Sequence, residues 1–98
     1  MTDTELLQKI KIGLGISDTY HDDVLKLHIE SAKDIMRSSG VRKAVVNSSV
    51  SVGCILAIVN DLYNYSSGGV KLSDFSVKRI IQLCYVTEDE VTDNVQTE

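Results

Sequence analysis

One stretch of the chain, residues 50–65 with the sequence VSVGCILAIVNDLYNY, constrains the fold more than any other. At about 100° per residue, its apolar side chains cover roughly 200° of a helical wheel. A helix that is apolar over so much of its circumference needs partners on several sides. With about four turns it is too short to span a bilayer. We therefore expect this stretch to form the central helix of a small all-α bundle of about four helices, with no membrane association.

A first, weaker helix is expected near the N-terminus. Thr2 and Glu5 have the spacing of a capping box, which predicts a helix that begins at about residue 3. Gly13 and Gly15 provide the backbone freedom to end it. The expected buried stripe is Leu6, Leu7, Ile10 and Leu14.

A second helix is expected from about Thr19 to Ser39, capped by Ser17 or Asp18 and closed by Gly40. Acidic residues in its first turn and Arg37 in its last match the helix dipole. The apolar face expected for this helix consists of Val24, Leu25, His28, Ile29, Ala32, Ile35 and Met36.

A last helix follows the Ser66–Gly69 break and is expected to be capped by Ser73 with Ser76. Its expected buried stripe is Val77, Ile80, Ile81 and Cys84. The segment between the second and central helices, Val41–Ser49, is ambiguous. Its valines are compatible with a short strand or an extended, flexible linker, and Asn47–Ser49 with a turn or a cap of the central helix.

Length and charge define one domain and a tail. A chain of 98 residues is expected to form a single domain, over residues 1–86. Residues 87–98 carry five acidic side chains and no basic one, whereas the rest carries ten basic and nine acidic side chains. We expect this acidic tail to be disordered. A nearly neutral body does not indicate a strong nucleic-acid binder.

No residue pattern indicates catalysis or a metal. His21 and His28 are two helical turns apart, about 10.5 Å, which is too far for both to bind one ion from the same helix. No Gly-x-Ser-x-Gly or phosphate-binding glycine motif is present. Cys54 and Cys84 are expected to be buried free thiols. We expect no enzyme, no cofactor and no metal site.

Two other functions are compatible with a small helical domain. A DNA-binding regulator would need bases on a recognition helix, and the candidates are Lys78 and Arg79, or Arg42 and Lys43. Two basic residues in each pair are few for a DNA-binding surface, and the acidic tail would compete with DNA for them. The other alternative is a helical adaptor that binds one partner protein.

The narrow polar side of the central helix is a candidate contact surface. Small residues one turn apart allow close approach of another helix, and asparagine side chains can form hydrogen bonds across a contact. The same pattern also fits a side that faces solvent. This strip consists of Gly53, Ala57, Asn60 and Asn64.

The order of these segments resembles the small head-to-tail connector proteins of tailed bacteriophages and prophages. The resemblance covers roughly residues 5–86. It rests on LLQKIKIGLGISDTYHDDVLKLHIESAKDIM, then a variable linker, VGCILAIVNDLYNY, a glycine-containing loop and FSVKRIIQLCYV.

The resemblance implies a structural virion protein, assembled in the bacterial host cytoplasm. Such a protein would form a homo-oligomeric ring beneath the portal, join head to tail and extend the DNA channel. Its partners would be further copies of itself, the portal protein and tail-side or head-completion proteins. Double-stranded DNA would pass through without sequence-specific binding. The linker would then provide contacts to neighbouring subunits, with Val41, Arg42, Lys43 and Val45 as candidates.

Overall fold

The computed structural model describes residues 2–64 and 72–87, and these residues are mainly helical. The elements are α1 (Asp3–Leu14), α2 (Asp22–Ser38), α3 (Lys43–Val46), the 3-10 helix η1 (Ser49–Ser51), α4 (Val52–Asn64) and α5 (Asp74–Cys84). No strand occurs in the described ranges, so the predicted all-α class is confirmed. None of the helices seen there is long and apolar enough to cross a membrane.

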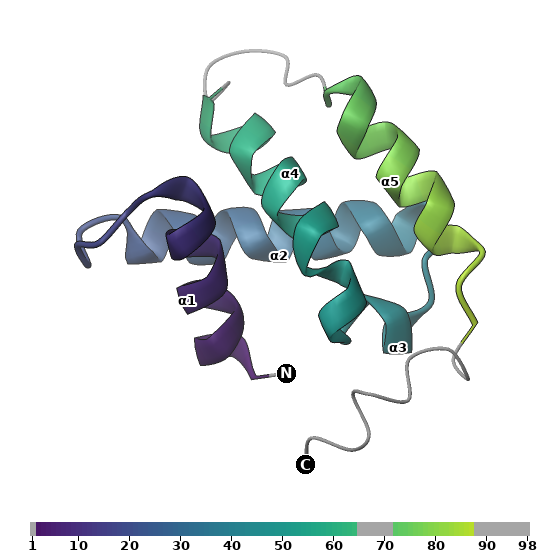
Figure 1. Ribbon diagram of the computed structural model, residues 1–98, viewed down its shortest axis with the longest axis horizontal. Helices are drawn as coiled ribbons and strands as arrows, with labels where there is room; N and C mark the ends of the chain where they lie inside the picture. Colours follow the sequence, from purple (N-terminus) through teal and green to yellow (C-terminus); the bar gives the residue numbers. More distant parts are fainter. Residues whose placement is uncertain (1, 65–71, 88–98) are drawn as a thin grey trace.

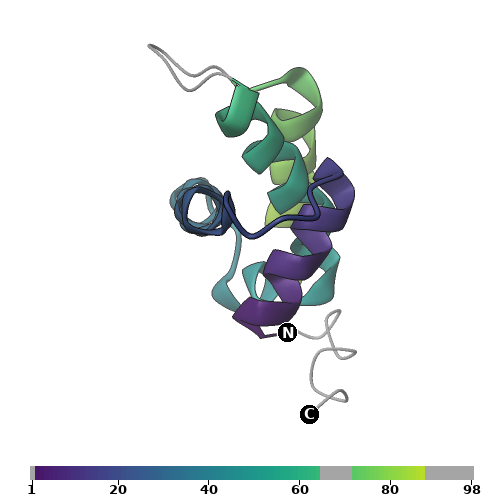
Figure 2. The same ribbon diagram turned by 90° about the vertical axis from the view of Figure 1, so that its left-hand side faces the viewer.

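Helix α4 lies at the centre of the molecule, as its sequence predicts. It contacts α1, α2 and α5. Figure 1 shows α1 and α5 on its two sides and α2 crossing behind it. In Figure 2, α2 is seen nearly end-on as a layer of its own, facing the layer formed by α1, α4 and α5. The core between these layers consists of Leu6, Leu7, Ile10, Leu25, Ile29, Ala32, Met36, Val41, Val45, Val46, Cys54, Ile55, Ile58, Val59, Ile80 and Leu83.

The capping box predicted at the start of α1 is confirmed. The Glu5 backbone N–H donates to Thr2 Oγ1 at 3.1 Å, and the Thr2 backbone N–H donates to Glu5 Oε1 at 3.0 Å. Gly15 ends the helix in the left-handed conformation, with φ of 74°. Gly13 has a different role from the one expected. A Cβ atom at this position would lie 2.6 Å from the Leu56 side chain, so Gly13 allows α1 to approach α4 closely.

The prediction that Ser17 or Asp18 caps α2 is wrong. The helix begins at Asp22, and its N-cap, His21, makes no capping hydrogen bond through its side chain. Asp18 Oδ1 instead accepts a hydrogen bond from the Tyr20 backbone N–H at 3.0 Å. Asp18 therefore stabilises the turn before the helix, because an aspartate can bond to the backbone two residues further on.

The Val41–Ser49 segment is neither a strand nor a flexible linker. It contains α3 and leads through η1 into α4. Val41, Val45 and Val46 are buried in the core, which explains why the valines need no strand partner. The Ser51 hydroxyl donates to the carbonyl oxygen of Val46 at 2.6 Å and closes the turn.

The expected stripe of α5 is partly wrong. Ile80 is buried, with 5% of its surface exposed, but Val77 and Ile81 are 42% and 52% exposed. The buried side is formed by Ser76, Ile80 and Leu83. The predicted cap is confirmed, since Ser73 Oγ accepts from the Ser76 backbone N–H at 3.3 Å.

Two predicted features lie outside the described residues. These are the break at residues 66–69 and the acidic tail, of which only Thr87 is described. The division into a domain over residues 1–86 and a tail therefore stays a prediction.

Candidate interaction surfaces

Three residues of the strip on α4, Gly53, Ala57 and Asn60, line a hollow at the surface. Gly53, Asn60 and Asn64 are exposed and Ala57 is half-buried. Asn64 Nδ2 donates to Asn60 Oδ1 at 3.2 Å, so these two side chains bond to each other along the helix. Nothing lies within 4 Å of a Cβ atom built on Gly53. The hollow has a volume of about 640 Å³ and is lined by Gly13, Leu14, Gly53, Leu56, Ala57, Asn60, Asp61, Ser73 and Phe75.

Asp61 joins α4 to α5 at one wall of this hollow. Its Oδ2 atom accepts hydrogen bonds from the Ser73 backbone N–H at 3.0 Å and from the Ser76 hydroxyl at 2.8 Å. The carboxylate is buried, with 6% of the residue exposed. The sequence pattern placed Asp61 on the polar side of the central helix and missed this role. The sequence signal for this role was the pair Ser73 and Ser76 at the start of α5, because donors that become buried there need an acceptor.

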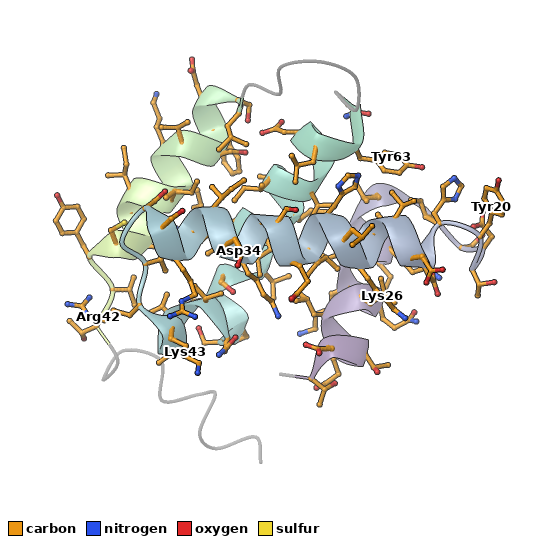
Figure 3. The ribbon with its side chains drawn as sticks, turned by 180° about the vertical axis from the view of Figure 1, so that it is seen from behind. Tyr20, Lys26, Asp34, Arg42, Lys43 and Tyr63 are labelled. Carbon is orange, nitrogen blue, oxygen red and sulfur yellow. The ribbon has the colours of Figure 1, made fainter. Side chains whose placement is uncertain are left out.

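The candidate residues of the α2–α4 connection separate into two kinds. Val41 and Val45 are buried in the core, so on a single chain they are not available for contacts. Arg42 and Lys43 are exposed. Arg42 Nη1 donates to the carbonyl oxygens of Val86 at 2.9 Å and Cys84 at 3.5 Å, which joins the start of α3 to the end of α5. Figure 3 shows Arg42 and Lys43 at the same end of the molecule.

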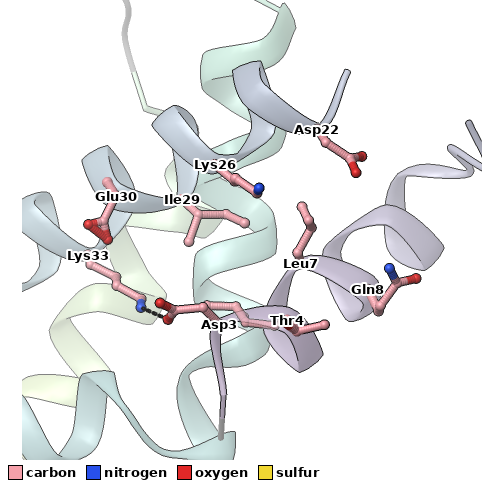
Figure 4. A pocket seen from close by; sticks show the side chains of 10 residues that line it. Asp3, Thr4, Leu7, Gln8, Asp22, Lys26, Ile29, Glu30 and Lys33 are labelled. Carbon is pink, nitrogen blue, oxygen red and sulfur yellow. Dashed lines mark ion pairs between the residues drawn. The ribbon is translucent and has the colours of Figure 1, made fainter. Parts of the chain in front are cut away.

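A second hollow, of about 510 Å³, lies between α1 and α2. Figure 4 shows Leu7 and Ile29 lining it, with Lys33 pointing toward Asp3. Lys33 Nζ lies 3.6 Å from Asp3 Oδ1, in an exposed ion pair. Such pairs contribute little to stability, so they serve mainly to align the two helices.

A buried ion pair also joins α1 to α2. Lys11 Nζ lies 2.9 Å from Asp22 Oδ1, and only 7% of the lysine side chain is exposed. The contact is a charge pair without the directional geometry of a hydrogen bond. The opposite charges compensate each other in this partly buried place, and Asp22 also lines the hollow between the two helices.

The histidines pack against aromatic rings. The rings of His21 and His28 lie edge-on to Tyr63, with centroid distances of 5.9 Å and 6.4 Å. Within residues 2–64 and 72–87, no group of three histidine, cysteine or acidic side chains could hold a metal ion. These contacts have the character of packing at the edge of the core.

Both cysteines are free, as predicted, although Cys84 is only half-buried. Burial raises the pKa of the Cys54 thiol from 9.0 to about 11. The Cys84 thiol lies 3.4 Å from the carbonyl oxygen of Ser39 and can donate a weak hydrogen bond to it.

We expect Cys54 to react slowly with Ellman's reagent in the native protein. The reactive species is the thiolate, and a rise of the pKa from 9.0 to about 11 lowers its fraction at pH 8 about 100-fold. In a Cys84→Ser variant, which isolates Cys54, the rate should rise at least about 100-fold when urea unfolds the chain. Equal rates in the native and unfolded states would contradict the buried position.

Comparison with known proteins identifies the family. No curated protein and no solved structure matches the chain. The family model described as phage gp6-like head-tail connector protein matches residues 4–83, a span that runs from α1 almost to the end of α5. Because the match covers most of the chain, this protein belongs to the phage gp6-like head-tail connector family.

Proposed function

We propose that this protein assembles into a ring at the portal vertex of a phage, where it joins head to tail and extends the DNA channel. The observation that carries the proposal is the family match over residues 4–83. Membership in a family of head-tail connectors implies a structural role in the virion, at the junction between head and tail.

The surface of the molecule supports a function that depends on assembly with other protein subunits. A domain of this size has a small core, so contacts with neighbours add stability that one chain lacks. Exposed apolar side chains remain on several helices and in the turns beside them, and these are Ile12, Tyr20, Val24, Leu27, Phe75, Val77, Ile81 and Tyr85. Several ionisable groups have structural roles: Glu5 caps α1, Lys11 pairs with Asp22, and Asp61 bonds to the start of α5.

The partners in this proposal are further copies of the chain, the portal protein, and tail-side or head-completion proteins. Assembly would take place in the host cytoplasm and end in the virion. Double-stranded DNA would pass through the ring without sequence-specific contacts. The body of the chain has ten basic and nine acidic side chains, so it lacks the excess of positive charge with which proteins hold phosphates.

Native mass spectrometry of the protein, alone and mixed with its portal protein, tests the proposal. We expect a complex that contains several copies of the chain on one portal ring. A monomer in the absence of portal protein agrees with the proposal if the ring forms when portal is added. If no ring and no portal binding occurred under any condition, the proposal would be wrong. A salt-dependent gel shift on duplex DNA would then favour a DNA-binding regulator.

A further inference from the structure

The molecule has two different exposed faces on opposite sides. Helix α2 forms a layer by itself, and its outer side faces away from α4 (Figure 2). The strip of α4 belongs to the other layer, and because α2 lies behind α4 in Figure 1, the exposed residues of the strip are inferred to face away from α2. Asp34 lies on the outer side of α2 in the reverse view of Figure 3.

The outer side of α2 is an acidic ridge, which we define as Asp23, Leu27, Glu30 and Asp34. These four residues are all exposed, and their spacing of four, three and four residues places them on one side of the helix. Leu27 is 69% exposed between the carboxylates. The basic residues Lys26 and Lys33 line the hollow next to α1, and Glu30, at the edge of the ridge, lines this hollow as well (Figure 4).

The hollow on α4 has a different character. Its floor contains the small or apolar residues Gly53, Leu56 and Ala57, and Phe75 stands beside it with 65% of its surface exposed. The carboxylate of Asp61 in its wall is buried and accepts hydrogen bonds from the start of α5.

The spacing along α1 and α5 places two cations beside this hollow, outside the residues that line it. Lys9 is exposed and precedes Gly13 by one turn, on the side of α1 that approaches α4. Arg79 is half-buried and follows Phe75 by one turn. We call the floor, Phe75 and these two cations the cationic groove.

We propose that the copies of this chain in the ring join head to tail, with the acidic ridge of one copy seated in the cationic groove of the next. The inference rests on the proposed ring. A carboxylate ridge with an exposed leucine complements an apolar hollow edged by cations. Two copies joined ridge to ridge would instead bring like charges together. Different patches on opposite sides of a subunit produce a heterologous contact, and such contacts form a ring when the rotation from copy to copy closes.

Charge reversal tests this pairing. The ridge variant carries Glu30→Lys and Asp34→Lys, and the groove variant carries Lys9→Glu and Arg79→Glu. Lys9, Glu30 and Asp34 are exposed and Arg79 is half-buried, so both variants should remain folded, and their unfolding temperatures are measured beside the wild type. We expect each variant alone to lose at least tenfold in the amount of ring formed on the portal protein, measured by native mass spectrometry.

Mixing the two variants gives the sharper result. In an alternating ring, the reversed ridge meets the reversed groove and the native ridge meets the native groove. We therefore expect an equimolar mixture to restore the ring, and a chain with all four reversals to form it alone. Lys26→Glu is the matched control: it adds an acidic residue one turn before Glu30 and leaves the carboxylates of the ridge in place, so it should assemble as the wild type does.

Gly53→Leu provides a test without a change of charge. Open space around Gly53 leaves the fold intact, but a leucine there fills the groove and should prevent the ring from forming. If the wild type forms rings and the ridge, groove and Gly53→Leu variants form them equally well, the pairing is wrong while the proposed function stands. The pairing is also wrong if folded ridge and groove variants fail to restore the ring when mixed, or if Lys26→Glu blocks it equally. If the wild type forms no ring with portal protein, the proposed function fails and the pairing fails with it.

Discussion

Replacement of Ile80 by alanine is expected to lower the free energy of unfolding by about 2–4 kcal/mol, whereas the same change at Ile81 should cost less than about 1 kcal/mol. The two isoleucines are neighbours on α5 and lose the same atoms. Ile80 is 5% exposed and belongs to the core, but Ile81 is 52% exposed. Only the first substitution leaves a cavity that the surrounding side chains cannot fill.

Urea denaturation followed by circular dichroism measures both changes. The slope of the free energy against urea concentration should be the same for both variants and the wild type, because neither change alters the surface exposed on unfolding appreciably. Equal costs at Ile80 and Ile81, or a larger cost at Ile81, would show that α5 packs with the side chains first expected from its hydrophobic pattern.

Removal of the Asp61 carboxylate is the second change with a large expected effect. Asp61→Ala should lower the free energy of unfolding by about 2–4 kcal/mol, because it leaves two donors at the start of α5 without their acceptor. These donors are the Ser73 backbone N–H and the Ser76 hydroxyl, and Ser76 is fully buried. The exposed neighbour Asn60 offers a matched control, and Asn60→Ala should cost less than about 0.5 kcal/mol.

A double-mutant cycle with Ser76→Ala separates the hydrogen bond from other effects of the substitution. We expect the two changes together to cost less than the sum of the single changes, by at least about 1 kcal/mol. Additive costs would mean that the Asp61 carboxylate and the Ser76 hydroxyl do not interact in solution.

Much of the fold could be predicted because local patterns decided it. The nearly continuous apolar surface of residues 50–65 requires a central position, and α4 has that position. The Thr2–Glu5 box and the Ser73 cap are local hydrogen-bonding patterns, and both occur as predicted. The family resemblance also depended on the order of such segments, and the family match confirms it.

Long-range polar contacts could not be predicted from hydrophobic periodicity. Periodicity alone predicts that Asp61 faces solvent. In the structure it accepts hydrogen bonds from Ser73 and Ser76, twelve and fifteen residues later in the chain. These bonds turn Ser76 inward and Ile81 outward, so the buried side of α5 differs from its apolar stripe. Lys11 is buried for a similar reason, since its partner Asp22 belongs to the next helix.

The candidate surfaces were predicted in part. The strip of Gly53, Ala57, Asn60 and Asn64 was found from spacing alone, but the hollow above it depends on where Phe75 lies. The valines near α3 were misplaced because a short apolar run fits a strand, an extended arm or a buried helix equally well. Only tertiary packing, which buries Val41 and Val45, decides among them.

Arg42 also ties the backbone that follows α5 to a distant part of the chain. Val86 packs against the core, and its backbone N–H bonds to the last turn of α5. The Arg42 guanidinium adds a bond to the carbonyl oxygen of Val86, forty-four positions later in the chain, and so holds this segment against the corner between α2 and α3. The Cys84 thiol reaches the same corner at the carbonyl oxygen of Ser39, so a force applied to the end of α5 would be shared with the end of α2.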